Sequence, residues 1–226
     1  MESNRANAVR ERPVRVWDFP TRLFHWLTVA LVAGAWITER FNWINLHVRF
    51  GETLLGLVLF RLMWGCVGSE TSRFSSFVST PAAAFRHLRH LFRREPDIQV
   101  GHNPAGAWMV LLLLALLLIE TLSGIYVYND IADEGPLSEI VPARIANAIS
   151  ALHAYGWYVL LAAVVLHLCA IGVYALAKGH NLLGPMLTGR KRLPSTIAAP
   201  ARASLWLAAL LLALAATIVA LLATYL

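Results

Sequence analysis

The sequence predicts an all-α membrane protein: a four-helix transmembrane bundle, a fifth C-terminal transmembrane helix and a cytoplasmic interfacial helix. Of the 226 residues, 58% are hydrophobic and only 14% are charged, against roughly 25% charged residues in a typical soluble domain. The hydrophobic residues also gather in long uninterrupted runs, which is the pattern of membrane-spanning helices. Both observations argue against a water-soluble globular protein.

Five apolar stretches are long enough to cross a bilayer, which takes about 20 residues of helix. They cover residues 21–38, 45–67, 104–128, 149–177 and 203–226. The first is short and carries Arg22 and His25 near its start, but large apolar residues fill the rest. Because no small-residue cleavage site precedes or interrupts it, we expect this span to remain in the mature chain rather than to serve as a signal peptide.

Basic residues are concentrated on one side of these spans. Residues 1–22, 69–103 and 178–202 each carry five Lys or Arg, whereas the opposite side has only Arg40, Arg49 and Arg144. Basic short loops stay in the cytoplasm. We therefore expect a multi-pass protein of the bacterial inner membrane with a cytoplasmic N-terminus and a periplasmic C-terminus. This bias explains the net charge of +6 without a nucleic-acid partner.

The loop segment Thr80–Pro96 predicts the interfacial helix. It opens with a capping threonine and Pro81, and it separates apolar from basic residues on two faces. The apolar face holds Phe85, Leu88, Leu91 and Phe92, and the other holds Arg86, Arg89, Arg93 and Arg94. His87 and His90 lie on the polar face, where we interpret them as solvated histidines, with a metal site as the alternative.

Four histidines fall in or at the predicted spans, where an imidazole is costly unless it is used. His153 and His167 are fourteen residues apart in one helix, which returns them to nearly the same face about 21 Å apart. The orientation of the spans puts His47 near the outer surface with His153, and His25 near the inner surface with His167. The sequence thus predicts two pairs of facing imidazoles, one at each level.

Paired imidazoles from facing helices suit a six-coordinate haem iron held inside a helical bundle. The sequence has two cysteines but neither C-x-x-C nor C-x-x-C-H, so the two haems would be non-covalent, that is b-type. We therefore predict a di-haem bundle over residues 21–192, preceded by a cytoplasmic segment at 1–20 and followed by the extra helix at 203–226.

Further residues are candidates for haem binding. Gly51 and Gly156 follow His47 and His153 on the same helix faces and would leave room for a flat macrocycle. Arg61 lies fourteen residues after His47 and would pair with a propionate of the lower haem, with snorkelling to the cytoplasmic surface as the alternative. Glu120 and Glu52 are candidates for proton relay, or else for hydrogen bonding between helices.

Several motifs resemble the bacterial cytochrome b561 family, which includes the b-type cytochrome subunits of membrane-bound nickel–iron hydrogenases. The motifs are VWDFPTRLFHW at 16–26, residues 46–77, GHNPAGAW at 101–108 and LHAYGWYVLLAAVVLHL at 152–168. The resemblance implies two b haems, with His25, His47, His153 and His167 as axial ligands. It also matches Arg73 and His102–Asn103 to loop motifs of that family, and it leaves the fifth span as an anchor or a packing surface for a partner.

The predicted function is electron transfer across the membrane, between a periplasmic redox protein or cytochrome and the quinone pool. One alternative is a stand-alone oxidoreductase that passes electrons from superoxide to ubiquinone. The acidic outer loop at 129–148 would repel that anion and favours a cationic or protein donor. A haem-free transporter or membrane hydroxylase is the second alternative, and the sequence leaves homo- and hetero-oligomers equally open.

Overall fold

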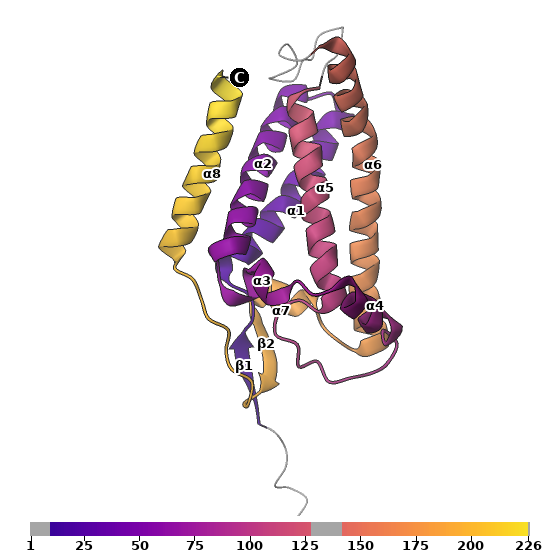
Figure 1. The fold of residues 1–226 in the computed structure, drawn as a ribbon, viewed down its shortest axis with the longest axis vertical. Coiled ribbons are helices and arrows are strands. Elements are labelled where there is room, and N and C mark those ends of the chain that lie inside the picture. Colours follow the sequence, from indigo (N-terminus) through magenta and orange to yellow (C-terminus); the bar gives the residue numbers. More distant parts are fainter. Residues whose placement is uncertain (1–9, 128–141, 226) are drawn as a thin grey trace, which may run out of the picture.

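The computed structural model describes residues 10–127 and 142–225. The first nine residues of the predicted N-terminal segment at 1–20 and most of the acidic outer loop at 129–148 therefore lie outside the described residues. Within them, long helices run side by side, as Figure 1 shows: α1 (Phe19–Arg40), α2 (Ile44–Val67), α5 (Pro104–Ile125), α6 (Ala143–Val173) and α8 (Leu205–Tyr225). The pairs α1–α2, α2–α5 and α5–α6 pack together, and α8 packs on α2. The all-α membrane fold class is confirmed.

Four of the described helices are long and apolar enough to cross a bilayer: Ile44–Val67, Pro104–Ile125, Ala143–Lys178 and Leu205–Thr224. These identify a multi-pass membrane protein. α1 has 22 residues, which is span length, but it is not among the four. Its role as a span stays a prediction. α6 begins at Ala143 rather than at residue 149, directly after Pro142 at its N-cap.

Three helices begin with the same local pattern. The side chains of Asp18, Thr80 and Asn103 accept hydrogen bonds from backbone N–H groups three residues later, which caps α1, α4 (Pro81–Arg89) and α5. A proline stands in the first turn of each helix. An oxygen-bearing cap followed by proline satisfies the free N–H groups and presets the helical backbone.

The interfacial helix is shorter than predicted. α4 ends at Arg89, and Phe85 and Phe92 are 60% and 79% exposed. The chain leaves the helix because the following residues bind elsewhere. Glu95 lies 3.7 Å from Nζ of Lys178, and Asp97 lies 2.5 Å from Nζ of Lys191. These contacts hold Glu95 near the end of α6 and Asp97 near the segment Arg190–Pro194, away from a continued helix.

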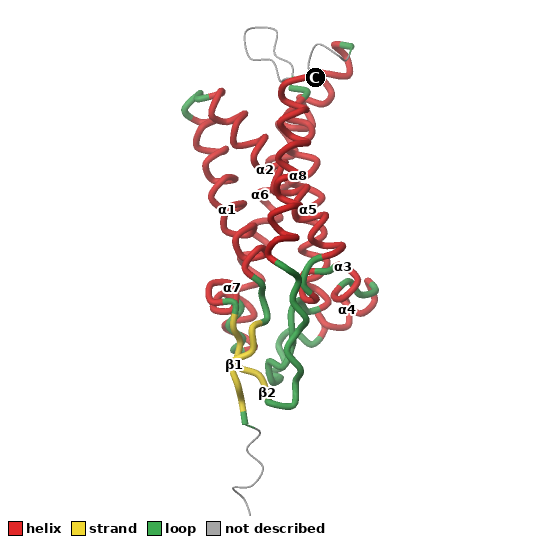
Figure 2. Tube along the Cα trace, turned by 90° about the vertical axis from the view of Figure 1, so that its left-hand side faces the viewer, coloured by secondary structure: helices red, strands yellow, loops and turns green. Residues whose placement is uncertain are grey.

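A small β-sheet is an addition to the all-α prediction. β1 (Glu11–Arg15) pairs antiparallel with β2 (Arg190–Pro194), below the bundle in Figure 2. Val14 and Val16 pack with Leu193 in a buried cluster, which fixes the register through side-chain burial. The sheet ties the start of the chain to the segment that leads into α8.

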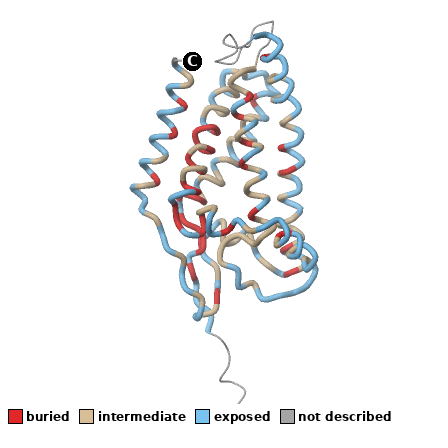
Figure 3. Tube along the Cα trace, viewed as in Figure 1, coloured by how far each residue is buried: buried red, intermediate tan, exposed pale blue. Residues whose placement is uncertain are grey.

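The shorter elements lie at the same end of the bundle. They are the turn η1 (Glu70–Ser72), the helix α3 (Phe74–Phe77), the π-helical turn η3 (Tyr174–Lys178) and the helix α7 (Leu183–Thr188). Figure 3 shows that the buried positions follow α2 and the loop after it. Half of the α2 span is buried, against 22% for α5 and 17% for α6. α2 is therefore the centre of the bundle, and the outer helices leave apolar faces for lipid.

Candidate functional site

The structure brings His47 and His153 together at one end of the bundle. Their rings, on the first turn of α2 and on α6, have centroids 6.2 Å apart and planes at 84° to each other. With metal–nitrogen bonds of about 2 Å on each side, two imidazoles on one metal ion place their ring centres about 6 Å apart. The separation therefore fits two axial ligands of a single iron.

The hydrogen bonds of these two rings also fit metal binding. Nδ1 of His47 donates to the backbone oxygen of Ala35 at 2.9 Å, and Nδ1 of His153 donates to the backbone oxygen of Glu120 at 2.9 Å. Metal-binding histidines usually donate their second ring N–H in this way, which fixes the tautomer and the ring orientation. Nε2 of each ring is left to bind the metal.

The two glycines beside this pair have different neighbours. A Cβ atom at Gly51 would meet no atom within 4 Å, whereas one at Gly156 would lie 2.6 Å from Oε2 of Glu120. Gly51 thus faces open space one turn after His47, as a cradle for a flat group requires. At Gly156 that space holds the carboxylate of Glu120.

At the opposite end of the bundle, His25 on α1 lies within electrostatic range of His167 on α6. Nδ1 of His25 is buried and finds no hydrogen-bond partner among the described residues. A buried imidazole nitrogen without a partner costs free energy unless another group binds it. The His25 ring therefore has a buried nitrogen available to another group.

Arg61 is buried between these helices rather than extended to the surface. Its exposed fraction is 2%, its Cζ atom lies 5.1 Å from the ring centre of Phe74, and its Nη1 atom has no hydrogen-bond partner in the described part of the chain. A buried cation requires a compensating anion. Asp18 is near enough to act electrostatically on Arg61, and the unpaired Nη1 atom leaves a donor for a further anion. The burial of Arg61 is inconsistent with snorkelling, and the propionate contact stays a prediction.

His102 belongs to the same buried region, which the residue pattern alone did not indicate. Its ring lies between those of Trp17 and Phe77, with centroids 4.6 Å away on either side. Burial, together with the nearby charges of Arg61 and His167, lowers the pKa of His102 to about 3. The ring is therefore neutral. The sequence could have indicated a buried position for His102, because it directly precedes Asn103, the residue that caps α5.

Arg73 also contributes an unsatisfied group, since its Nε atom is buried and lacks a partner among the residues described. Together, Arg61, Arg73 and His102 leave buried nitrogen atoms without a partner among the described residues, at the end of the bundle away from His47. Several unpaired donors in one region are rare in a folded protein. They fit the negatively charged edge of a bound cofactor.

The remaining candidates have other partners. Glu52 accepts a hydrogen bond from Arg49 at 3.1 Å. Nε2 of His87 lies 2.6 Å from the hydroxyl of Tyr174. Within residues 10–127 and 142–225, no group of three or more His, Cys, Asp or Glu could hold a bare metal ion, so the His87–His90 pair has no third ligand there.

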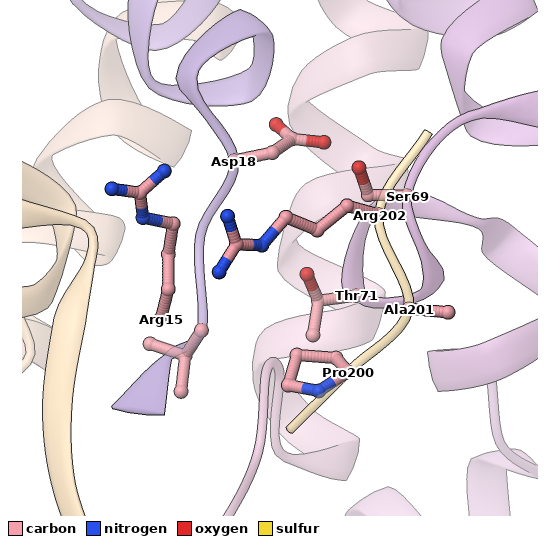
Figure 4. Close-up of a pocket in the computed structure, with 8 residues that line it drawn as sticks. Arg15, Asp18, Ser69, Thr71, Pro200, Ala201 and Arg202 are labelled. Carbon is pink, nitrogen blue, oxygen red and sulfur yellow. The ribbon is translucent and has the colours of Figure 1, made fainter. Parts of the chain in front are cut away.

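A separate pocket lies where β1 meets α1. Figure 4 shows the side chains of Arg15, at the end of β1, and Arg202, in the segment before α8, beside each other below Asp18. None of the four candidate histidines lines it. It is lined by Arg15, Val16, Asp18, Ser69, Thr71, Pro200, Ala201 and Arg202. This pocket is therefore distinct from the histidine sites.

A multi-pass helical bundle with facing imidazoles defines the class of membrane cytochromes that hold haem without a covalent bond. The family model described as prokaryotic cytochrome b561 matches residues 16–189, and the chain belongs to this family. Membership of this family implies that the protein binds b-type haem and takes part in membrane electron transfer.

Two curated proteins are similar. A probable Ni/Fe-hydrogenase B-type cytochrome subunit of Rhizobium leguminosarum bv. viciae is 22% identical over 219 residues, which cover 81% of this chain and 91% of the relative. A protein of the same description from Bradyrhizobium diazoefficiens is 28% identical over 123 residues, covering 43% of this chain and 50% of the relative. No solved structure gives a significant match.

Proposed function

We propose that this cytochrome holds two b haems and moves electrons across the bacterial inner membrane, between a periplasmic redox protein and the quinone pool. The upper haem would be ligated by His47 and His153, and the lower by His25 and His167. The observation that carries the proposal is the 6.2 Å separation of the His47 and His153 rings, each with its Nδ1 atom on a backbone carbonyl.

The protein's own residues would bind, orient and shield the cofactors. His47 and His153 present Nε2 from two different helices, so the distance between α2 and α6 sets the ligand spacing. Arg61 would bind a propionate of the lower haem, with charge-assisted hydrogen bonds. Haem supplies the one-electron ferric/ferrous couple, and the surrounding apolar helices keep water away from it.

The path across the membrane follows from the spacing of the ligands on α6. His153 and His167 are fourteen residues apart, which corresponds to about 21 Å along a helix. The concentration of Lys and Arg in the loops at the α4 end supports a cytoplasmic location for the lower pair. Electrons would thus enter or leave on the periplasmic side near His47, and the N- and C-termini would lie on opposite sides.

The partner is proposed from the relatives. Both are described as probable B-type cytochrome subunits of a Ni/Fe-hydrogenase, which supports a complex with a periplasmic enzyme that delivers electrons. The apolar helix α8, which packs on α2, would serve as an anchor or as a contact for such a partner. Quinone would be the exchangeable acceptor or donor.

The alternative function is a stand-alone oxidoreductase that takes electrons from superoxide. The sequence feature that bears on the donor is the acidic loop at 129–148, and most of it lies outside the described residues, so the structure adds nothing in favour of this alternative. Reduction of the haem-loaded protein in detergent distinguishes a protein electron donor from superoxide. Fast reduction by a superoxide-generating system, with no partner protein present, would support the stand-alone reading and contradict the need for a protein donor. Membership of a cytochrome family already disfavours a haem-free transporter or hydroxylase.

The central test is haem content in single variants. We expect two haem b per chain by the pyridine haemochrome assay, and one in each of His47→Ala, His153→Ala, His25→Ala and His167→Ala. His90→Ala, an exposed histidine on the surface next to α4, is the matched control and should keep both. Full haem content in His47→Ala or His153→Ala would refute the upper site.

A further inference from the structure

Glu120 is directed at one ligand of the proposed upper haem. Its Oε1 atom lies 3.5 Å from Nδ1 of His153, and its side chain is only 14% exposed. Among the described residues, it forms no ion pair with a lysine or arginine. Burying a carboxylate without a basic partner costs free energy. We therefore expect an interaction with the His153 ring to offset that cost.

The helices are shaped to admit this carboxylate. A side chain at Gly156 on α6 would begin 2.6 Å from Oε2 of Glu120, and one at Gly124 on α5 would begin 3.0 Å from Cε1 of His153. Ser123 adds its hydroxyl 3.3 Å from Nδ1 of the same ring. We call Glu120, Ser123, Gly124 and Gly156 the His153 socket. Its two glycines leave the space that the carboxylate and the imidazole fill.

The partner ligand has no such socket. Among the residues that the structure describes, Nδ1 of His47 donates to the neutral backbone oxygen of Ala35 alone. The glutamate nearest to it in sequence, Glu52, is instead paired with the exposed Arg49 at 3.1 Å. The two proposed ligands of one iron therefore differ in their outer contacts, with the negative charge on the His153 side.

We propose that Glu120 is a positioning residue that orients His153 and lowers the reduction potential of the haem this histidine ligates. The inference rests on the proposed function. When it is ionised, a carboxylate beside Nδ1–H makes the imidazole a stronger electron donor, which favours the ferric state of the iron. Gly156 acts in the same interaction, because it gives the carboxylate its place, and its role differs from the haem-facing one predicted from sequence.

The test is a redox titration of the full-length, haem-loaded protein in detergent, monitored by its absorption spectrum. Glu120→Gln keeps the size of the side chain and removes its charge. We expect two haems per chain, with one of them shifted to higher potential and the other unchanged. Glu52→Gln is the matched control, since it removes a glutamate already paired with arginine, and its shift should be smaller.

A second pair of variants tests the geometry without removing the acid. In Gly156→Ala the new methyl group displaces the carboxylate, so the same haem should shift in the same direction. Gly172→Ala is the control on the same helix, because a Cβ atom there meets nothing within 4 Å, and both potentials should stay as they are. If Glu120→Gln loses haem, Gly156→Ala decides the question by the same measurement.

The outcomes distinguish failure of the inference about Glu120 from failure of the proposed function. Two haems with unchanged potentials in Glu120→Gln would overturn the role of Glu120 and leave the proposed function standing. Two haems in His153→Ala would overturn the proposed function itself. Equal shifts in Glu120→Gln and Glu52→Gln would also overturn the inference, because they would show a general effect of charge rather than a specific contact with His153.

Discussion

The indole nitrogen of Trp64 donates a hydrogen bond to Oδ2 of Asp18 at 3.1 Å, which joins the end of α2 to the start of α1. The hydroxyl of Ser72 lies 3.1 Å from the same oxygen, and Oδ1 accepts the backbone N–H of Thr21. Asp18 is 8% exposed. One buried carboxylate thus caps a helix and holds two other segments of the chain against it.

Asp18→Ala should therefore lower the free energy of unfolding by about 2–4 kcal/mol. The loss of the helix cap costs about 1 kcal/mol, and the buried indole N–H of Trp64, left without a partner, costs about 1–3 kcal/mol more. The hydroxyl of Ser72 keeps the hydroxyl of Thr21 as a partner. Glu39→Ala is the control, since its ion pair with Arg40 is exposed and worth less than about 1 kcal/mol. Unfolding in detergent, followed by circular dichroism, measures both, and equal losses would contradict the prediction.

Arg61→Met tests the proposed propionate contact. Methionine keeps much of the buried apolar volume but removes the guanidinium. Hydrogen bonds to charged groups contribute about 1.5–3 kcal/mol, so the lower haem should bind roughly 10- to 150-fold more weakly. The rate of haem loss to an apoprotein acceptor reports this change. Arg49→Met, on the opposite side of the membrane, should leave that rate unaltered. A lower haem held as tightly in Arg61→Met as in the parent would exclude the contact.

The proximity of His47 and His153 could be predicted because helical periodicity and membrane orientation together fix the level and the face of each residue. The role of Gly156 could not. A helix pattern places it on the face of His153, but only the packing of α5 against α6 shows that Glu120 fills the space beside it. Gly156 and His153 are on one face of α6, but Gly156 faces the carboxylate of Glu120 and not the space for a haem.

The sheet was missed for a different reason. Val14 and Val16 alternate with Arg15, which is a strand pattern, but the strand is short and contains Pro13, a residue that argues against a strand. Its partner strand, Arg190–Pro194, lies at the other end of the chain. Pairing between such distant segments depends on the tertiary fold, which a local pattern does not contain.

Acid should destabilise the haem-depleted protein through His102. Its pKa is about 3 in the folded state, against an ordinary value of 6.5. Below pH 6.5 the unfolded state binds a proton that the folded state excludes, so stability falls as the pH falls, until the pH nears 3. Between pH 7 and pH 5 the loss should be about 2 kcal/mol.

His102→Phe removes this titration while keeping a ring between Trp17 and Phe77. The free energy of unfolding of that variant, measured by chemical denaturation at several pH values, should depend less on pH than that of the parent over this range. His90→Gln is the control and should retain the parent's dependence. An unchanged slope in His102→Phe would mean that another group is responsible.

Ala215→Leu tests how closely α8 is fitted to α2. Ala215 is fully buried in a cluster with Phe60 and Trp64, so the larger side chain must displace packed atoms, at a cost of typically about 1–3 kcal/mol. Ala216→Leu, one residue later, points to an exposed position and should change stability by less than about 0.5 kcal/mol. Because α8 contributes none of the proposed ligands, haem content should stay the same in both variants. A thermal melt combined with the haem assay checks both expectations, and loss of haem in Ala215→Leu would show that α8 supports the cofactor sites as well as the fold.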